Sequence, residues 1–273
     1  FSFFLLLYIF IFIFKSDSIL LTNKNFKYIG CLIILFSPVM TAEVWMNSLN
    51  AMSYFGIFAF LVLFEKKETK FRYINYLVFV ISGLSGYYAS ALAPLYLIKY
   101  YYKKTFTNLT YLLILILTSS IQFLTTVYSV STNEIASERF LITYEKIISF
   151  IYNVILKSLF GREILQKILA LFNHGFLSIA AIIFTIISLI ILIMIALRKK
   201  DYVLNLVIFS FLIQSLLIIF GSAYDNFVGG RYSVCVGVIF LFIFLRLYNL
   251  YRDTFMKYFY GLIILIFLFV GFL

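Results

Sequence analysis

The chain has 273 residues, of which 64% are hydrophobic and 12% charged, and its mean hydropathy is +1.07. A water-soluble domain cannot bury so much apolar surface, whereas repeated apolar runs of about 18 or more residues are typical of membrane helices. The net charge of +11 lies in the connections between apolar runs, which favours cytoplasmic loops beside anionic lipid and not nucleic-acid binding. We therefore predict an all-α, multi-pass integral membrane protein with one transmembrane helix bundle over 1–273.

Apolar stretches that could form membrane spans follow one another along the chain. They lie near 1–14, 28–41, 50–64, 73–98, 108–130, 175–197, 203–221, 232–250 and 258–273. The chain begins at Phe1 and ends at Leu273 within such stretches, so we expect it to be an internal piece of a longer protein. The first stretch has no basic region before it and no small-residue cleavage site after it, which argues against a signal peptide.

Five connections between these stretches carry clusters of lysine and arginine. They are 15–27, 65–72, 99–104, 198–201 and 246–257. Placing all five on the cytoplasmic side satisfies the positive-inside rule. This arrangement requires the stretch 73–98 to begin and end on the same side of the membrane.

The stretch 73–98 is interrupted by the sequence SGLSGYY at 82–88. Two helices meeting at this glycine-rich tip would each be too short, at ~1.5 Å per residue, to cross a ~30 Å hydrocarbon core. We predict a re-entrant or short helical hairpin that is shielded by protein. Ser82, Gly86 and Ser90 recur every four residues, which favours close helix packing; anion binding at the start of the second arm is the alternative.

The longest outer connection, 131–174, has a helical pattern of its own. In the region of about 143–173, Lys146, Asn153, Lys157 and Lys167 recur at roughly helical spacing, and Gly161 interrupts the pattern. We interpret this region as two amphipathic helices that lie in the outer membrane interface.

Metal-binding residues are scarce. The chain has two isolated cysteines, Cys31 and Cys235, and one histidine, His174. This content argues against a zinc, haem or iron–sulfur site, and we expect no bound cofactor. A requirement for a divalent metal stays open.

The segment 37–50, SPVMTAEVWMNSLN, places polar groups within an apolar region. Glu43, Asn47, Asn50 and Tyr54 fall on one stripe of a 3.6-residue helix. A carboxylate facing lipid would cost about 2.5–3.5 kcal/mol on insertion scales, so the stripe is expected to face the bundle interior or a water-filled cavity. It is either a set of hydrogen bonds between helices or an outward-facing polar site, and we favour the site.

The segment 221–232, GSAYDNFVGGRY, is predicted to be an outer loop that ends where Arg231 opens the next span. An arginine there opposes the helix dipole, which prefers negative charge at a helix N-terminus. An anion bound to both the guanidinium and the N–H groups would explain it, and phosphate is the natural candidate. Pairing with Asp225 or contact with lipid headgroups are the alternatives.

At these residues the chain resembles bacterial polytopic membrane proteins of the GT-C glycosyltransferase superfamily. The similar features are the E-V-x-x-N-x-x-N pattern from Glu43 to Asn50, the S-G-L-S-G tip with the downstream Pro94, and the G-R-Y sequence at 230–232. The resemblance implies an enzyme of the bacterial inner membrane. It would transfer a sugar from a polyprenyl-phosphate donor at the non-cytoplasmic face, with membrane lipids as its other partners.

The resemblance also implies roles for particular residues. Arg231 would hold the lipid phosphate, while Glu43, Asn47 and Asn50 would bind the acceptor or the sugar. Tyr54, on the same stripe, and Asp225 and Tyr232, beside Arg231, complete the predicted substrate-binding set. The family's usual catalytic carboxylate lies in the first outer loop, which would precede Phe1, so Glu43 is only a candidate catalytic residue.

Three other functions remain open. A transporter or flippase of lipid-linked sugars would also need a polar stripe and a broken hairpin, although it would favour internal repeats and polar groups at mid-membrane depth. A protein similar to O-antigen polymerases would also act on lipid-linked glycans. A non-catalytic membrane scaffold would need no catalytic set.

Overall fold

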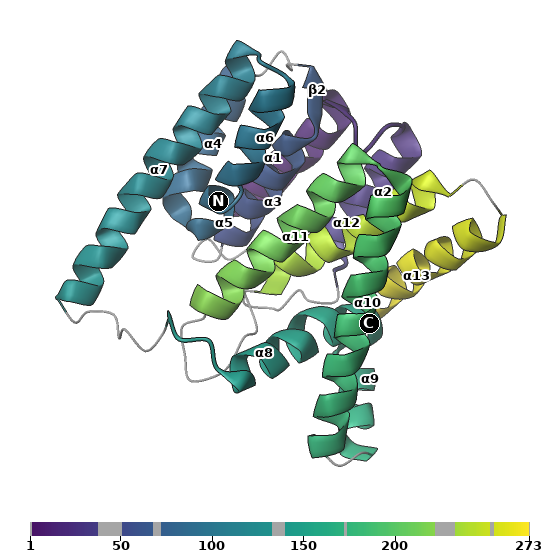
Figure 1. Cartoon of the computed structure of the whole chain (residues 1–273). Helices are drawn as coiled ribbons and strands as arrows, with labels where there is room; N and C mark the ends of the chain where they lie inside the picture. Colours follow the sequence, from purple (N-terminus) through teal and green to yellow (C-terminus); the bar gives the residue numbers. More distant parts are fainter. Residues whose placement is uncertain are drawn as a thin grey trace.

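The computed structural model describes residues 2–37, 51–67, 72–132, 140–171, 174–221, 233–251 and 254–272, and these are almost wholly helical (Figure 1). The first half comprises α1 (Ser2–Lys15), α2 (Lys24–Leu35), α3 (Met52–Leu63), α4 (Arg72–Ser85), α5 (Tyr87–Ser90), α6 (Ala93–Tyr102) and α7 (Phe106–Ser131). The second half comprises α8 (Tyr144–Phe150), a π-helical turn (Ile151–Leu156), α9 (Lys157–Leu171), α10 (His174–Lys199), α11 (Tyr202–Gly221), α12 (Ser233–Leu250) and α13 (Thr254–Phe272). The all-α prediction is confirmed, apart from a small antiparallel ladder between β1 (Asp17–Ser18) and β2 (Glu65–Lys67).

Some of these helices are, by length and composition together, long and apolar enough to cross a membrane. Within the described ranges they are α7, α11 and α12, and the bent pair formed by 72–85 and 87–102 would make a fourth. By contrast, α1 has 14 residues and α3 has 12. At ~1.5 Å per residue these two reach about 18–21 Å, less than a ~30 Å hydrocarbon core. The chain is therefore a candidate membrane protein in which some stretches predicted as spans are shorter helices.

Burial distinguishes central helices from peripheral ones. In α12, 72% of an apolar stretch of 18 residues is buried inside the protein, whereas in α7 only 17% of such a stretch is buried. The exposed face of α7 carries large apolar side chains such as Leu117, Phe123 and Leu124. Such a face would be unfavourable in water but is suited to lipid contact. The core therefore forms around α12 and α3, whose residues are all buried except Met52, and α7 lies at one edge (Figure 1).

The break that the sequence predicts in the stretch 73–98 is present, and the bent pair of helices is a broken span or a re-entrant hairpin. The two arms, 72–85 and 87–102, are bent by 108° relative to one another, and the break falls at Gly86. Phe79 of the first arm packs edge-on against Tyr96 of the second arm and against Tyr111 of α7, with ring centroids 5.3 and 4.7 Å apart. These aromatic contacts hold both arms against the N-terminal half of α7.

Small residues allow the hairpin to pack closely. A Cβ atom added at Gly83 would lie 2.2 Å from Oγ1 of Thr118 in α7, so only glycine fits this contact. The Ser90 hydroxyl donates a hydrogen bond of 3.3 Å to the Gly83 carbonyl. Both contacts support the interpretation of this stretch as a helix-packing surface.

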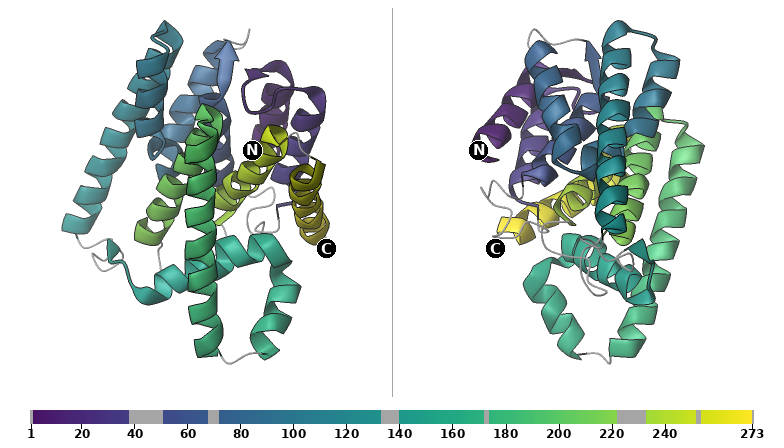
Figure 2. Two further views of the ribbon diagram at one scale, coloured as in Figure 1. Left: turned by 45° about the vertical axis from the view of Figure 1, so that its right-hand side comes forward. Right: turned by 90° about the vertical axis from the view of Figure 1, so that its left-hand side faces the viewer.

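The described part of the predicted amphipathic region, up to Leu171, forms helices, and it breaks at Gly161. Gly161 has φ +72°, a left-handed conformation that favours glycine, and an added Cβ would lie 2.1 Å from Cγ1 of Val270 in α13. Figure 2 shows α8 running crosswise to α10 at one end of the bundle. Its placement in the membrane interface stays a prediction.

Candidate functional site

The described parts of the five basic connections lie together at one end of the structure, as their assignment to one side of the membrane requires. The β1–β2 ladder joins the connections 15–27 and 65–72 by pairing Asp17 with Lys67. Nζ of Lys103, at the end of α6, donates a hydrogen bond to the Lys66 carbonyl and adds the connection 99–104. We call this end of the structure the basic end; β2 and the α6–α7 turn lie there, at the top of Figure 1.

The remaining two connections join the same cluster through aromatic contacts of Tyr202, at the start of α11, and Tyr251, directly after α12. The rings of Tyr102 and Tyr202 meet with centroids 5.6 Å apart, which links the connection 99–104 to the start of α11. Nζ of Lys199 lies 4.4 Å from the ring centroid of Tyr251, which links the connections 198–201 and 246–257.

A bidentate ion pair between Arg246 and Asp201 holds the start of α11 against α12 at the basic end. Nη2 and Nε of Arg246 donate hydrogen bonds of 2.6 and 3.0 Å to the two carboxylate oxygens of Asp201. Oδ1 of Asp201 also accepts a hydrogen bond of 2.7 Å from the Leu204 N–H, so Asp201 caps α11. Burial opposes ionisation of Asp201, but the hydrogen bonds from Arg246 and Leu204 outweigh it and lower the pKa of this carboxyl group.

We expect Asp201→Ala to lower the free energy of unfolding by about 2–4 kcal/mol, because it removes the cap and leaves Arg246 without its partner. Asp201→Asn keeps a cap and should cost less. Because the folded pKa is lowered, the stabilisation from Asp201 is present above its ordinary pKa of 3.8 and is lost as the pH falls through the folded value. Thermal unfolding in detergent across acidic pH measures both effects, and equal stability of the Ala and Asn variants would contradict the capping role.

At the opposite end, three elements meet closely. A Cβ atom added at Gly56 of α3 would lie 2.6 Å from Cβ of Tyr88 in α5 and 2.9 Å from Sγ of Cys235 in α12. One added at Gly86, at the hairpin break, would lie 3.3 Å from Cβ of Met52 in α3. The start of α3, the hairpin tip and the start of α12 therefore pack against one another, and we call this the three-helix contact.

A hydrogen bond ties α11 to the same place. Nε2 of Gln214, which is fully buried, donates a hydrogen bond of 2.5 Å to the Tyr88 carbonyl. The C-terminal part of α11 is thereby anchored to the hairpin tip, a few residues before α11 ends at Gly221.

Most of the predicted site residues fall outside the described residues. These are Glu43, Asn47, Asn50, Asp225, Arg231 and Tyr232. Tyr54 is described; it is fully buried in the first turn of α3, next to the three-helix contact. The assignment of all seven residues to a substrate site stays a prediction.

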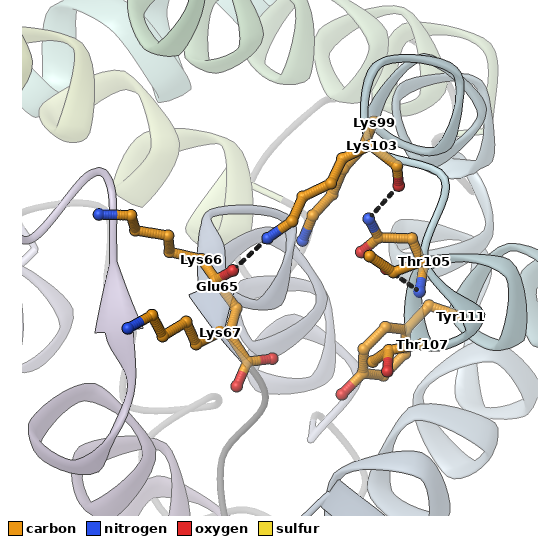
Figure 3. A pocket seen from close by; sticks show the side chains of 9 residues that line it. Glu65, Lys66, Lys67, Lys99, Lys103, Thr105, Thr107 and Tyr111 are labelled. Carbon is orange, nitrogen blue, oxygen red and sulfur yellow. Dashed lines mark hydrogen bonds between the residues drawn. The ribbon is translucent and has the colours of Figure 1, made fainter.

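A pocket of about 230 Å³ opens at the basic end, on the side away from the three-helix contact (Figure 3). Its walls are β2 (Glu65–Lys67), Lys99 of α6, Lys103 directly after α6, and residues of the α7 N-cap and first turns, Thr105, Thr107, Asn108 and Tyr111. Both Glu65 and Lys99 are 8% exposed, so the pocket has ionisable groups in its inner wall. We call it the basic pocket.

In the sequence, the connections 65–72 and 99–104 indicated only which side of the membrane they occupy. Nothing in the sequence pointed to the basic pocket. The contacts that build it join residues 37 positions apart: Nζ of Lys99 donates to the Val62 carbonyl at 2.9 Å, and Lys103 bonds to Lys66. The available signal was the return of the hairpin to its starting side, which brings the two basic connections together. Threonine at 105, a good N-cap before an apolar run, also marked the start of α7.

Across the described part of the chain, no group of three or more His, Cys, Asp or Glu side chains is arranged to hold a metal ion. Comparison with protein-family models, with curated proteins and with solved structures finds no match.

Proposed function

We propose that this protein is a membrane glycosyltransferase that transfers a sugar from a polyprenyl-phosphate-linked donor at the non-cytoplasmic face. The three-helix contact is the observation that carries the proposal. The segment 38–50 leads into α3 and the segment 222–232 leads into α12, and the contact packs Gly56 of α3 against Cys235 of α12. This proximity supports a single site to which both polar segments contribute.

The side of the membrane follows from charge. Lysine and arginine clusters are retained on the cytoplasmic side of bacterial membrane proteins. The contacts that gather the five basic connections at one end support placing that end in the cytoplasm. The three-helix contact lies at the other end, which would then face the non-cytoplasmic side.

The proposed chemistry assigns a role to each polar segment. The bond between the sugar C1 and the donor phosphate oxygen breaks, a bond between C1 and an acceptor hydroxyl oxygen forms, and the acceptor proton passes to a base. Arg231 would stabilise the negative charge that the departing polyprenyl phosphate carries. Glu43 is the candidate base, and Asn47 and Asn50 would orient the acceptor or the sugar by hydrogen bonds.

A transfer assay tests this proposal. The protein is reconstituted in proteoliposomes with a panel of polyprenyl-phosphate sugars labelled in the sugar, and the release of polyprenyl phosphate is measured with transfer of the label. We expect both to appear together and only with externally added acceptor.

The competing functions give different results in this assay. Movement of the label across the membrane with the sugar–phosphate bond intact would identify a flippase and contradict the proposal. Growth of a lipid-linked glycan by whole oligosaccharide units would identify the polymerase-like alternative. Absence of both release and movement, in protein that is folded by thermal unfolding, would favour a scaffold.

A further inference from the structure

The basic pocket has a charge that suits an anionic ligand. Four lysines line it, Lys66, Lys67, Lys99 and Lys103, and Glu65 is the one carboxylate among its described lining residues. Within the described part of the chain, none of these four amino groups forms an ion pair. The lining therefore has four basic side chains and one acidic side chain, an excess of basic residues.

Two of the lysines are held in place by the backbone of neighbouring elements. Nζ of Lys99 donates a hydrogen bond of 2.9 Å to the Val62 carbonyl, and Nζ of Lys103 donates one to the Lys66 carbonyl. Figure 3 shows these two side chains extending from α6 toward β2, whereas Lys66 and Lys67 point away from them. Each ammonium group has three N–H donors and uses one in these bonds, so both retain donors for a ligand.

The start of α7 adds to this arrangement. Oγ1 of Thr105 accepts a hydrogen bond of 3.3 Å from the Asn108 N–H, and Nδ2 of Asn108 donates one of 2.7 Å to the Lys103 carbonyl. The first turn of α7, a helix of 26 residues, is thereby tied to the residue that carries one of the pocket lysines. The positive end of the helix dipole and the lysines act in the same direction on a bound anion.

Glu65 sets the balance of charge inside the pocket. Its carboxylate interacts electrostatically with Lys99, which is buried, whereas Lys103 just after α6 is exposed. Glu65 therefore offsets part of the positive charge at Lys99, and Lys103 remains exposed to an entering ligand.

We propose that the basic pocket binds a phosphate group. Lysine ammonium groups are strong donors to phosphate oxygens, and basic pockets between helices on the cytoplasmic side of membrane proteins are suited to phosphorylated headgroups. A volume of about 230 Å³ is below the range of about 300–1,000 Å³ typical of drug-sized ligands, which fits a single phosphate-bearing group. The phosphate can belong to a lipid headgroup or to a soluble ion, and this site is independent of the proposed sugar transfer.

The test is a binding titration of the purified chain in a non-ionic detergent. The probes are short-chain phosphatidic acid, diacylglycerol with the same acyl chains, and inorganic phosphate. Lys103→Gln removes a charge from the pocket, and the matched control Lys104→Gln removes the same charge from the neighbouring exposed residue, which does not line it. Thermal unfolding of each protein without ligand confirms that the variants are folded.

We expect phosphatidic acid to bind saturably and more tightly than diacylglycerol. Loss of one lysine contact in Lys103→Gln should lower the affinity for phosphatidic acid about fivefold. The affinity of Lys104→Gln should stay within about twofold of that of the original chain. Binding of inorganic phosphate as tight as that of phosphatidic acid would assign the site to a soluble phosphate, and selective binding of the lipid would assign it to a headgroup. Equal responses to phosphatidic acid and diacylglycerol in the original chain, or equal weakening in the two variants, would overturn the proposal.

Discussion

Replacement of Gly56 by alanine is expected to lower the free energy of unfolding by about 1–3 kcal/mol, although alanine is the better helix former. The added methyl group would lie 2.6 Å from Cβ of Tyr88 and 2.9 Å from Sγ of Cys235. The side chain atoms that it meets are close to the backbones of α5 and α12, so the clash is relieved only by separating the helices. Gly56→Val adds two further methyl groups and should cost more.

A matched control is available in the same chain. Gly221, the last residue of α11, is also a helical glycine, and no atom of the described residues lies within 4 Å of a Cβ atom added there. Gly221→Ala should therefore leave stability unchanged or raise it slightly, by up to about 1 kcal/mol. Thermal unfolding of the variants in one detergent provides the comparison. If Gly56→Ala and Gly221→Ala are equally stable, the close approach of α3, α5 and α12 is wrong.

The Gly56 variant also bears on function. The three-helix contact holds the start of α3 beside the start of α12, and the proposed donor site draws on the segments that lead into both helices. Separating these helices should reduce donor binding per folded molecule as well as stability. In Gly221→Ala, both quantities should stay close to those of the original chain.

The sequence was informative where physical constraints act locally along the chain. Apolar runs predicted helices at the right places because burial or lipid contact is needed for each run separately. The glycine-rich tip at 82–88 predicted the hairpin break, and Gly161 predicted the break in α9, because both act on the local backbone. The positive-inside rule predicted the gathering of the five basic connections, since it applies to each connection in turn.

The sequence was uninformative where distant residues meet. Asp201 and Arg246 are 45 positions apart. In the sequence, Asp201 is only one acidic residue within the basic connection 198–201. Nothing local indicates that its carboxylate caps α11 and also binds α12. The β1–β2 ladder is similar, because its strands of two and three residues are too short for a recognisable alternating pattern.

The two candidate sites also differ in how far the sequence alone indicates them. Glu43 and Arg231 stood out because a charge beside an apolar run is costly and calls for an explanation. The basic pocket depends on the return of the hairpin, which places Lys103 against Lys66, and on the capping of α7 by Thr105. Its lysines were visible as a topological signal, but the approach of Lys99 and Lys103 to the backbone at Val62 and Lys66 required the fold.

Arg231→Lys is expected to weaken binding of a polyprenyl phosphate about tenfold, and Arg231→Ala about a hundredfold. A planar guanidinium donates two parallel hydrogen bonds to phosphate oxygens, whereas lysine presents a point charge, so retention of charge alone should not restore affinity. Expression and membrane insertion should stay near normal, because an arginine at the end of a span contributes little to the energy of spanning. Titration with polyprenyl phosphate measures the affinity of each variant, and thermal unfolding of the same samples measures its stability.

Asp225→Asn distinguishes phosphate binding from a structural ion pair. If Arg231 only pairs with Asp225, removing either charge should destabilise the protein by a similar amount, and lipid affinity per folded molecule should not change. If Arg231 binds the lipid phosphate, Asp225→Asn should leave affinity unchanged or raise it, because the guanidinium loses a competing carboxylate. Unchanged polyprenyl-phosphate affinity in folded Arg231→Ala protein would remove Arg231 from the proposed donor site. The glycosyltransferase proposal would then rest only on the three-helix contact and the side of the membrane that it faces.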